Sequence, residues 1–70
     1  MPMRAPDLLA SSGTLEGITK CINNYYCGIA GREWRVDPET LKVLNPDGFV
    51  NPRVIVRKKG RRYRFERVRS

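Results

Sequence analysis

The fold of this 70-residue chain is decided by a stretch near its C-terminus, Val54-Ile55-Val56-Arg57-Lys58-Lys59-Gly60-Arg61-Arg62-Tyr63-Arg64-Phe65. β-Branched, aromatic and charged residues alternate on both sides of a glycine, as expected for two half-buried strands joined by a tight turn. A two-residue loop at Lys59-Gly60 places Val56 opposite Tyr63 and Val54 opposite Phe65. The sequence therefore predicts a C-terminal β-hairpin over residues 53–69 whose apolar side chains share the core face.

The same register places the charged side chains on the opposite face and at the tip. It pairs Arg53 with Glu66 and Arg57 with Arg62 across the two strands, and it crowds residues 58–61 at the tip. Like charges directly opposite each other destabilise a strand pair unless another group offsets them. We therefore expect an external anion to relieve the repulsion between Arg57 and Arg62.

Nearly all of the excess charge lies in this hairpin. Residues 53–69 hold nine cations and one acid, whereas residues 1–52 hold five cations and six acids, and the whole chain carries a net charge of +7. A concentrated basic surface indicates an anionic partner, and a two-stranded ribbon fits a DNA major groove. We expect a small nucleic-acid-binding module, for DNA or RNA, that contacts phosphates through six side chains: Arg57, Lys58, Lys59, Arg61, Arg62 and Arg64.

Other interpretations of the basic hairpin stay open. The alternative is a small protein-interaction or inhibitor protein, of the kind that mobile elements encode, docking on an acidic protein surface. Cations on a strand also protect its edge from aggregation, so the charge is compatible with a merely solvated face. An exposed strand edge and an outward-facing Ile55 would in addition allow a homodimer. The charge pattern does not separate DNA from RNA or either from a protein partner.

The segment before the hairpin predicts one helix and further strands. The helix is expected to begin after an N-cap near Thr14 and to end at Gly28. Between these points, apolar residues recur at 3-4-3 spacing, namely Leu15, Ile18, Ile22 and Tyr25. Asp37-Pro38-Glu39-Thr40 predicts a type I turn that pairs Val36 with Leu41, and Asn45-Pro46-Asp47-Gly48 predicts a second turn.

These elements together predict an α+β fold in which one N-terminal helix packs on a three- to four-stranded antiparallel meander, in the order α-β-β-β-β. Residues 12–70 would form the single domain. Residues 1–11 contain two prolines and no periodic pattern, so we expect them to be a flexible leader.

The side-chain inventory argues against catalysis and metal binding. The chain has no histidine, and its two cysteines, Cys21 and Cys27, are too few for a structural zinc site, which takes about four ligands. We expect a non-enzymatic protein with no catalytic residue, metal or cofactor, and with reduced thiols. No apolar run approaches the roughly 20 residues of a membrane span, and no signal peptide is visible, so we expect a cytoplasmic location and no membrane partner.

Overall fold

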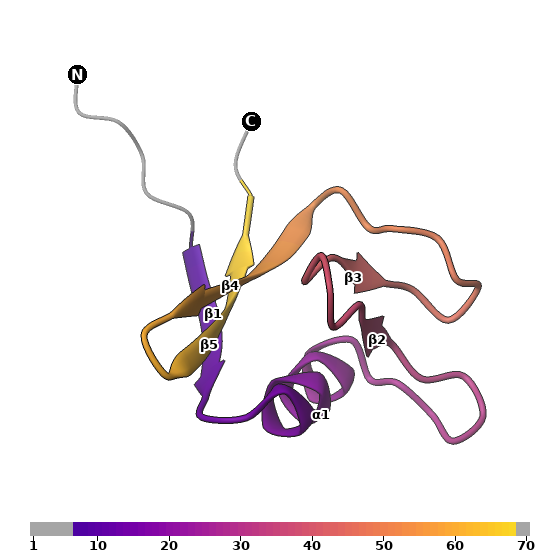
Figure 1. The fold of residues 1–70 in the computed structure, drawn as a ribbon. Helices are drawn as coiled ribbons and strands as arrows, with labels where there is room; N and C mark the ends of the chain where they lie inside the picture. Colours follow the sequence, from indigo (N-terminus) through magenta and orange to yellow (C-terminus); the bar gives the residue numbers. More distant parts are fainter. Residues whose placement is uncertain (1–6, 69–70) are drawn as a thin grey trace.

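The structure is a computed structural model that describes residues 7–68. Its elements follow the order β1 (Asp7–Ser12), α1 (Leu15–Tyr25), β2 (Arg35–Val36), β3 (Val43–Leu44), β4 (Val54–Lys59) and β5 (Arg62–Arg67) (Figure 1). β1, β5 and β4 form a three-stranded antiparallel sheet in that order, and β2 pairs with β3 in a second sheet. The predicted α+β class is confirmed. A strand precedes the helix, however, and the strands divide between two sheets.

β1 was not expected. Residues 7–11, predicted to lie in a flexible leader, form most of this strand, which pairs with β5 along its whole length. A bulge between Leu8 and Ala10 turns both Leu9 and Ala10 toward the core, so the strand lacks the strict alternation that sequence patterning detects. β5 thereby has a partner on each side. Residues 1–6 of the predicted leader lie outside the described residues.

The helix begins where the sequence predicts. Thr14 is the N-cap, and its Oγ1 accepts a hydrogen bond of 2.9 Å from the backbone N–H of Gly17. Ile18 and Ile22 are fully buried, while Tyr25, at the end of the same stripe, is 42% exposed. The predicted apolar face is therefore confirmed over most of the helix.

The helix ends in a Schellman motif built around Cys27. The backbone N–H of Gly28 donates to Asn23 O at 2.7 Å, and that of Cys27 donates to Asn24 O at 3.3 Å. Cys27 has a φ of 54°, which puts it in the left-handed region that glycine favours. The prediction that Gly28 ends the helix was thus wrong by one residue, because the left-handed residue is Cys27.

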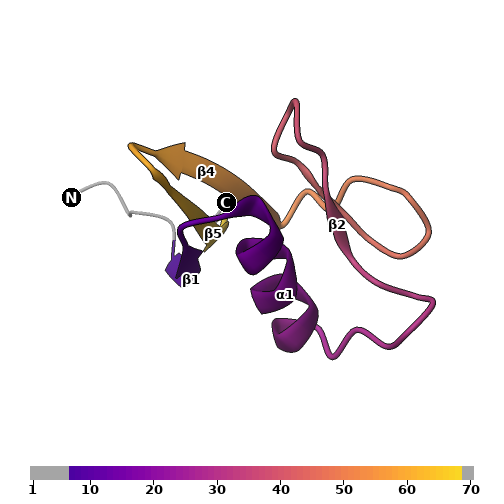
Figure 2. The same ribbon diagram turned by 60° about the horizontal axis from the view of Figure 1, so that its bottom comes forward.

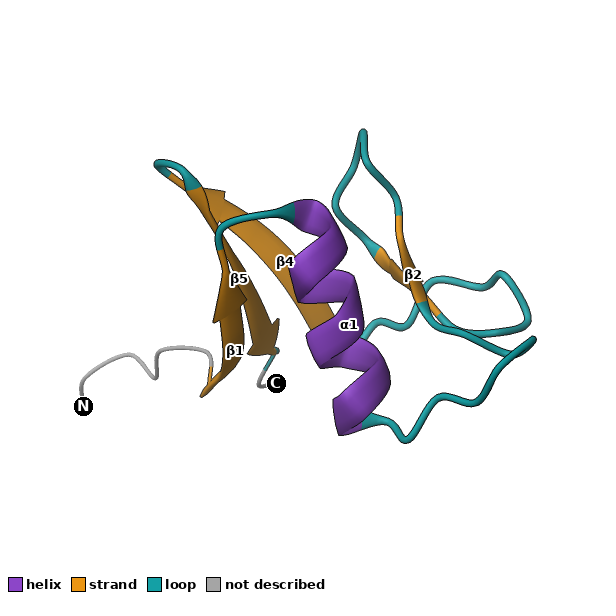
Figure 3. Cartoon of the chain, turned by 90° about the horizontal axis from the view of Figure 1, so that it is seen from below, coloured by secondary structure: helices purple, strands orange, loops and turns teal. Residues whose placement is uncertain are grey.

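α1 lies between the three-stranded sheet and the β2–β3 pair (Figures 2 and 3). The core forms on this inner side of the sheet, and no described helix covers the opposite face. The core consists of Ile18, Ile22, Val43, Val54, Val56 and Phe65. The Asn23 side chain links α1 to the segment before β2, since its Oδ1 accepts from Trp34 N at 2.7 Å and its Nδ2 donates to Trp34 O at 3.1 Å.

The two predicted turns have different outcomes. The turn at residues 45–48 is confirmed, because Gly48 N donates to Asn45 O at 2.8 Å and Gly48 has a φ of 88°. In the first turn, Val36 pairs with Val43 and not with Leu41. Leu41 adopts a φ of 61°, and the loop is two residues longer than predicted, so the predicted register was wrong.

Within residues 7–68, no helix has the length and the apolar character needed to cross a membrane.

Candidate nucleic-acid interface

The β4–β5 hairpin forms as predicted, with a different register. Lys59 pairs with Arg62 and Val56 with Phe65, so the loop is Gly60-Arg61 rather than Lys59-Gly60. Gly60 has a φ of 62° and Arg61 has no positive φ, as in a type II′ turn with glycine in its first central position. The predicted partners on β5 were therefore wrong by two residues, but a shift of two keeps every side chain on its predicted face.

Five of the six predicted contact residues lie on the outer face or at the tip. Arg57, Lys59, Arg62 and Arg64 occupy alternate positions that face away from the helix, and Arg61 lies in the loop. Lys58 differs from the prediction, because it belongs to β4 and shares a face with Tyr63. Its Nζ lies 5.6 Å from the centroid of the Tyr63 ring, at the range of a cation–π contact.

Glu66 neutralises part of the outer face. The register places Arg57 opposite Arg64, not opposite Arg62. Glu66 lies beside this pair with only 7% of its side chain exposed; its Oε2 accepts from Arg64 Nε at 2.9 Å, and its Oε1 lies 3.2 Å from Arg57 Nε. The predicted pair of Arg53 with Glu66 does not form. The repulsion that was expected to require an external anion is offset within the sheet itself.

Among the outward-facing cations that the sequence predicts as contact residues, the charge that Glu66 does not offset therefore lies at the tip. Among residues 7–68, no carboxylate pairs with Lys59 or Arg61. Arg62 Nε donates to the Ser11 hydroxyl of β1 at 3.1 Å, and Arg62 keeps its full charge in that bond. These three side chains, Lys59, Arg61 and Arg62, are called the tip cations below. Because no acid of residues 7–68 forms an ion pair with them, their positive field is available to an external anion.

Tyr63, Phe65 and Trp34 do not form a platform for bases on the outer face of the sheet. Phe65 is fully buried, and Tyr63 is half-buried on the core face, as the alternation predicts. Trp34 stacks on Tyr26 with ring centroids 3.9 Å apart and an angle of 12° between the rings. Base stacking on these rings is therefore not available on the outer face, and contacts there would be to phosphates.

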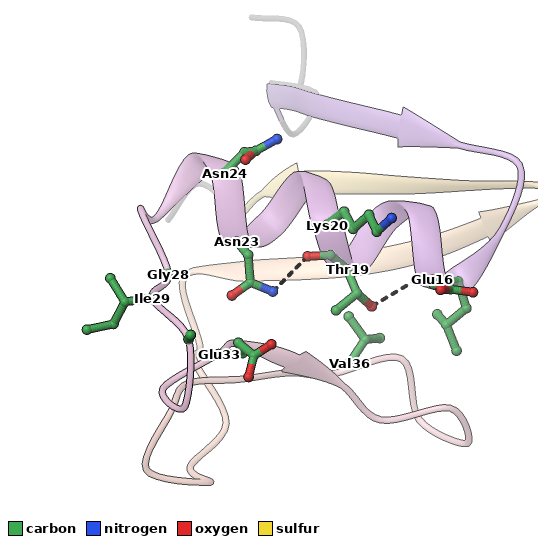
Figure 4. Close-up of a pocket in the computed structure, with 11 residues that line it drawn as sticks. Glu16, Thr19, Lys20, Asn23, Asn24, Gly28, Ile29, Glu33 and Val36 are labelled. Carbon is green, nitrogen blue, oxygen red and sulfur yellow. Dashed lines mark hydrogen bonds between the residues drawn. The ribbon is translucent and has the colours of Figure 1, made fainter.

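Two hollows were missed by the sequence reasoning, because each joins segments that are distant in sequence. One, of about 670 Å³, runs between α1 and the segment that leads into β2 (Figure 4). Glu16 and Glu33 line it together with Lys20, so it carries acids as well as a cation. The other, of about 740 Å³, lies at the end of the β4–β5 pair opposite the tip, beside Tyr25 and Tyr26.

The described part of the chain offers no metal-binding site. No group of three or more His, Cys, Asp or Glu side chains within residues 7–68 is placed to hold a metal ion. Cys21 and Cys27 are both free in the structure. Comparison of the chain with protein-family models, with curated proteins and with solved structures gives no match.

Proposed function

We propose that this protein is a small, non-enzymatic nucleic-acid-binding module that contacts phosphates through the tip of its β4–β5 hairpin. The observation that carries the proposal is the tip itself, where Lys59 and Arg61 have no carboxylate partner among the described residues. Phosphate binding would relieve their mutual repulsion and release counterions from the nucleic acid.

Glu66 divides the cations of the hairpin into two groups. Arg57 and Arg64 already hold a carboxylate, so a phosphate would have to compete with Glu66 for them. The tip cations have no such competitor. Fixing Arg57 and Arg64 against the sheet also lowers the entropy that they lose when they bind a phosphate lying across the outer face. We therefore expect the tip to supply most of the affinity and the outer face to orient the strand.

The test is a salt titration of binding to duplex and single-stranded oligonucleotides, followed by fluorescence anisotropy. With about four to six phosphate contacts, log K should fall with log[salt] at a slope of roughly −4 to −5. Replacing the three tip cations with glutamine should reduce the magnitude of the slope by about 2.7, because each lost contact accounts for about 0.9.

A matched control removes the same charge elsewhere. The variant Lys20→Gln/Arg35→Gln/Lys42→Gln loses three cations from α1, β2 and the β2–β3 loop, all outside the hairpin. Its slope should change by less than about one contact, roughly 0.9. Equal losses in the two triple variants would show that net charge, not the hairpin, governs binding. No binding of either oligonucleotide at low salt would contradict the proposal.

Glu66→Gln tests the role of the outer face. The substitution removes the acid that holds Arg57 and Arg64 and raises the net charge by one. Binding should become tighter and steeper in its salt dependence if these arginines reach phosphates. An unchanged affinity in a folded variant would confine the interface to the tip.

A protein partner is the second candidate, and exposed apolar side chains favour it. Phe49 is 71% exposed and Ile29 is 63% exposed, both on loops away from the basic tip. Such side chains serve as anchors in protein interfaces. Binding of a purified acidic partner that survives nuclease treatment and is lost in Phe49→Ala would favour this function over nucleic-acid binding.

A further inference from the structure

The pocket at the end of the sheet opposite the tip has a lining suited to an anion. It has a volume of about 740 Å³ and lies between the end of α1, the start of β4 and the end of β5. One valine and six polar residues line it, namely Tyr25, Tyr26, Asn45, Asn51, Arg53 and Arg67. No acid is among them, in contrast to the groove of Figure 4, which Glu16 and Glu33 line.

The strand pairing brings the two arginines of this pocket together. Val54 and Arg67 are cross-strand partners in β4 and β5, and Val68 N donates to Arg53 O at 2.8 Å just beyond them. The side chain of Asn51 holds the turn before β4, since its Oδ1 accepts from Arg53 N at 2.9 Å. Arg53 and Arg67 thus reach the pocket from neighbouring positions at one end of the sheet.

The hydrogen-bonding groups of the pocket are mostly donors. Arg67 Nη2 donates to the Tyr25 hydroxyl, and Asn51 Nδ2 donates to the Tyr26 hydroxyl at 3.4 Å. Each phenol accepts in these bonds, so its own proton stays available for another acceptor. Burial raises the pKa of the Tyr26 phenol above its usual range near 10, which keeps that proton in place at neutral pH.

Arg53 is the pocket cation whose side chain has no hydrogen-bond or ion-pair partner within the described part of the chain. Its guanidinium acts electrostatically on the Tyr26 phenol. The two guanidinium groups and the remaining protons of the two phenols give the pocket a set of strong donors, and Asp7, which acts electrostatically on Arg67, is not among its lining residues. Anionic oxygens are the groups that such a set binds most strongly.

We propose that this pocket binds a phosphomonoester group. Two guanidinium groups match its double negative charge, and the phenols supply donors for the remaining oxygens. The volume exceeds that of inorganic phosphate and falls within the range of about 300–1,000 Å³ of small-molecule sites, so it leaves room for the group that carries the phosphate. The same chemistry occurs in a small phosphate ester and at the phosphorylated end of a nucleic-acid strand.

The first test is a titration with inorganic phosphate, followed by the amide chemical shifts of the full chain in NMR spectra. Chloride at matched ionic strength serves as the reference. The amides of residues 25, 26, 53 and 67 should shift saturably with a dissociation constant on the order of 1 mM. Non-saturating shifts, or equal shifts with chloride, would overturn the proposal.

A matched pair of variants locates the site. Arg53→Gln should weaken phosphate binding about tenfold, as expected for the loss of one charge-assisted contact. Arg35→Gln removes the same charge from β2, outside both the pocket and the hairpin tip, and should change the dissociation constant by less than about twofold. Tyr26→Phe keeps the ring that stacks on Trp34 and removes the hydroxyl, so it should weaken binding severalfold with the fold intact. Equal dissociation constants in Arg53→Gln and Arg35→Gln would overturn the assignment.

The source of the phosphate is distinguished with oligonucleotides of one sequence that carry either a 5′-phosphate or a 5′-hydroxyl. If the ligand is a strand end, the phosphorylated strand should bind about tenfold more tightly than the hydroxyl strand, and Arg53→Gln should abolish this difference in affinity. A small ester as ligand predicts no such difference and saturable binding of glycerol phosphate that Arg53→Gln weakens. Because the tip cations are unchanged in Arg53→Gln, failure of the pocket leaves the salt dependence of tip binding intact, and the two proposals fail separately.

Discussion

Cys27 shows how one residue can carry a local conformational cost. It stands at the position after the helix where glycine is favoured, with a φ of 54° and an exposed, free thiol. A residue with a Cβ in this conformation costs roughly 1–2 kcal/mol relative to glycine. The Schellman hydrogen bonds from Gly28 and Cys27 hold it there, because they satisfy two carbonyl groups at the end of α1.

Cys27→Gly should therefore stabilise the protein. Relief of the left-handed strain is partly offset by the greater freedom of glycine in the unfolded chain, so we expect a gain of about 0.5–1 kcal/mol in the free energy of unfolding. Urea denaturation measures it. Cys27→Ala is the control, since it removes the thiol and keeps the Cβ, and its stability should match that of the parent. A glycine variant no more stable than the alanine variant would show that Cys27 is not strained.

Glu66 marks the limit of what the sequence could predict about individual side chains. All six cations of the candidate interface were identifiable from composition, and five lie where alternation puts them. The partners of Glu66 depend on the register, and the register depends on whether the loop is Lys59-Gly60 or Gly60-Arg61. Both loops suit a tight hairpin and preserve the faces, so patterning cannot choose between them. The neutralisation of Arg57 and Arg64 followed only from the structure.

Among the elements, the sequence did not predict β1, and it predicted only one of the two turns correctly. Asn45-Pro46-Asp47-Gly48 was predicted correctly because Gly48 supplies the left-handed residue that the loop needs. The preceding loop requires the same conformation from Leu41, a residue type that rarely adopts it, so its length could not be inferred. β1 escaped detection because its bulge places Leu9 and Ala10 on the same side.

The adjacent leucines of β1 provide a direct test of its role. Leu9 packs against the core, whereas Leu8 is 50% exposed on the outer face. Leu9→Ala should lower the free energy of unfolding by about 2 kcal/mol, and Leu8→Ala by only about 0.5 kcal/mol. Thermal or urea unfolding of the two variants gives the comparison. If neither substitution changed the stability, residues 7–11 would behave as the predicted leader and would not stabilise the sheet.

Across the whole molecule, the segment that supplies much of the core also carries most of the excess positive charge. The formal net charge is +7, and most of it lies in one hairpin whose strands also supply Val54, Val56 and Phe65 to the core. The segment that stabilises the fold by burial is therefore the segment that repels itself most strongly. Glu66 offsets this repulsion in the middle of the hairpin and leaves the tip cations uncompensated. A ligand that neutralises the tip would stabilise the fold as it binds.

Salt should reproduce this stabilisation without a ligand. Raising NaCl from about 0.01 M to about 0.3 M shortens the Debye length from roughly 30 Å to less than 8 Å and screens the repulsion among the tip cations. If about 1 kcal/mol of repulsion is relieved, Tm should rise by about 4–8 °C in a domain of this size. Circular dichroism in chloride salts, without phosphate or sulfate, measures the effect.

The double variant Lys59→Gln/Arg61→Gln is the control for this salt effect. These two side chains have no carboxylate partner among residues 7–68, so their removal should raise Tm at low salt and flatten its dependence on NaCl. The sign of the dependence is itself informative. Screening also weakens the pairs of Glu66 with Arg57 and Arg64, but that carboxylate is nearly buried and is screened less than the exposed tip. A Tm that falls as NaCl rises would show that attraction at Glu66 outweighs repulsion at the tip and would contradict this prediction.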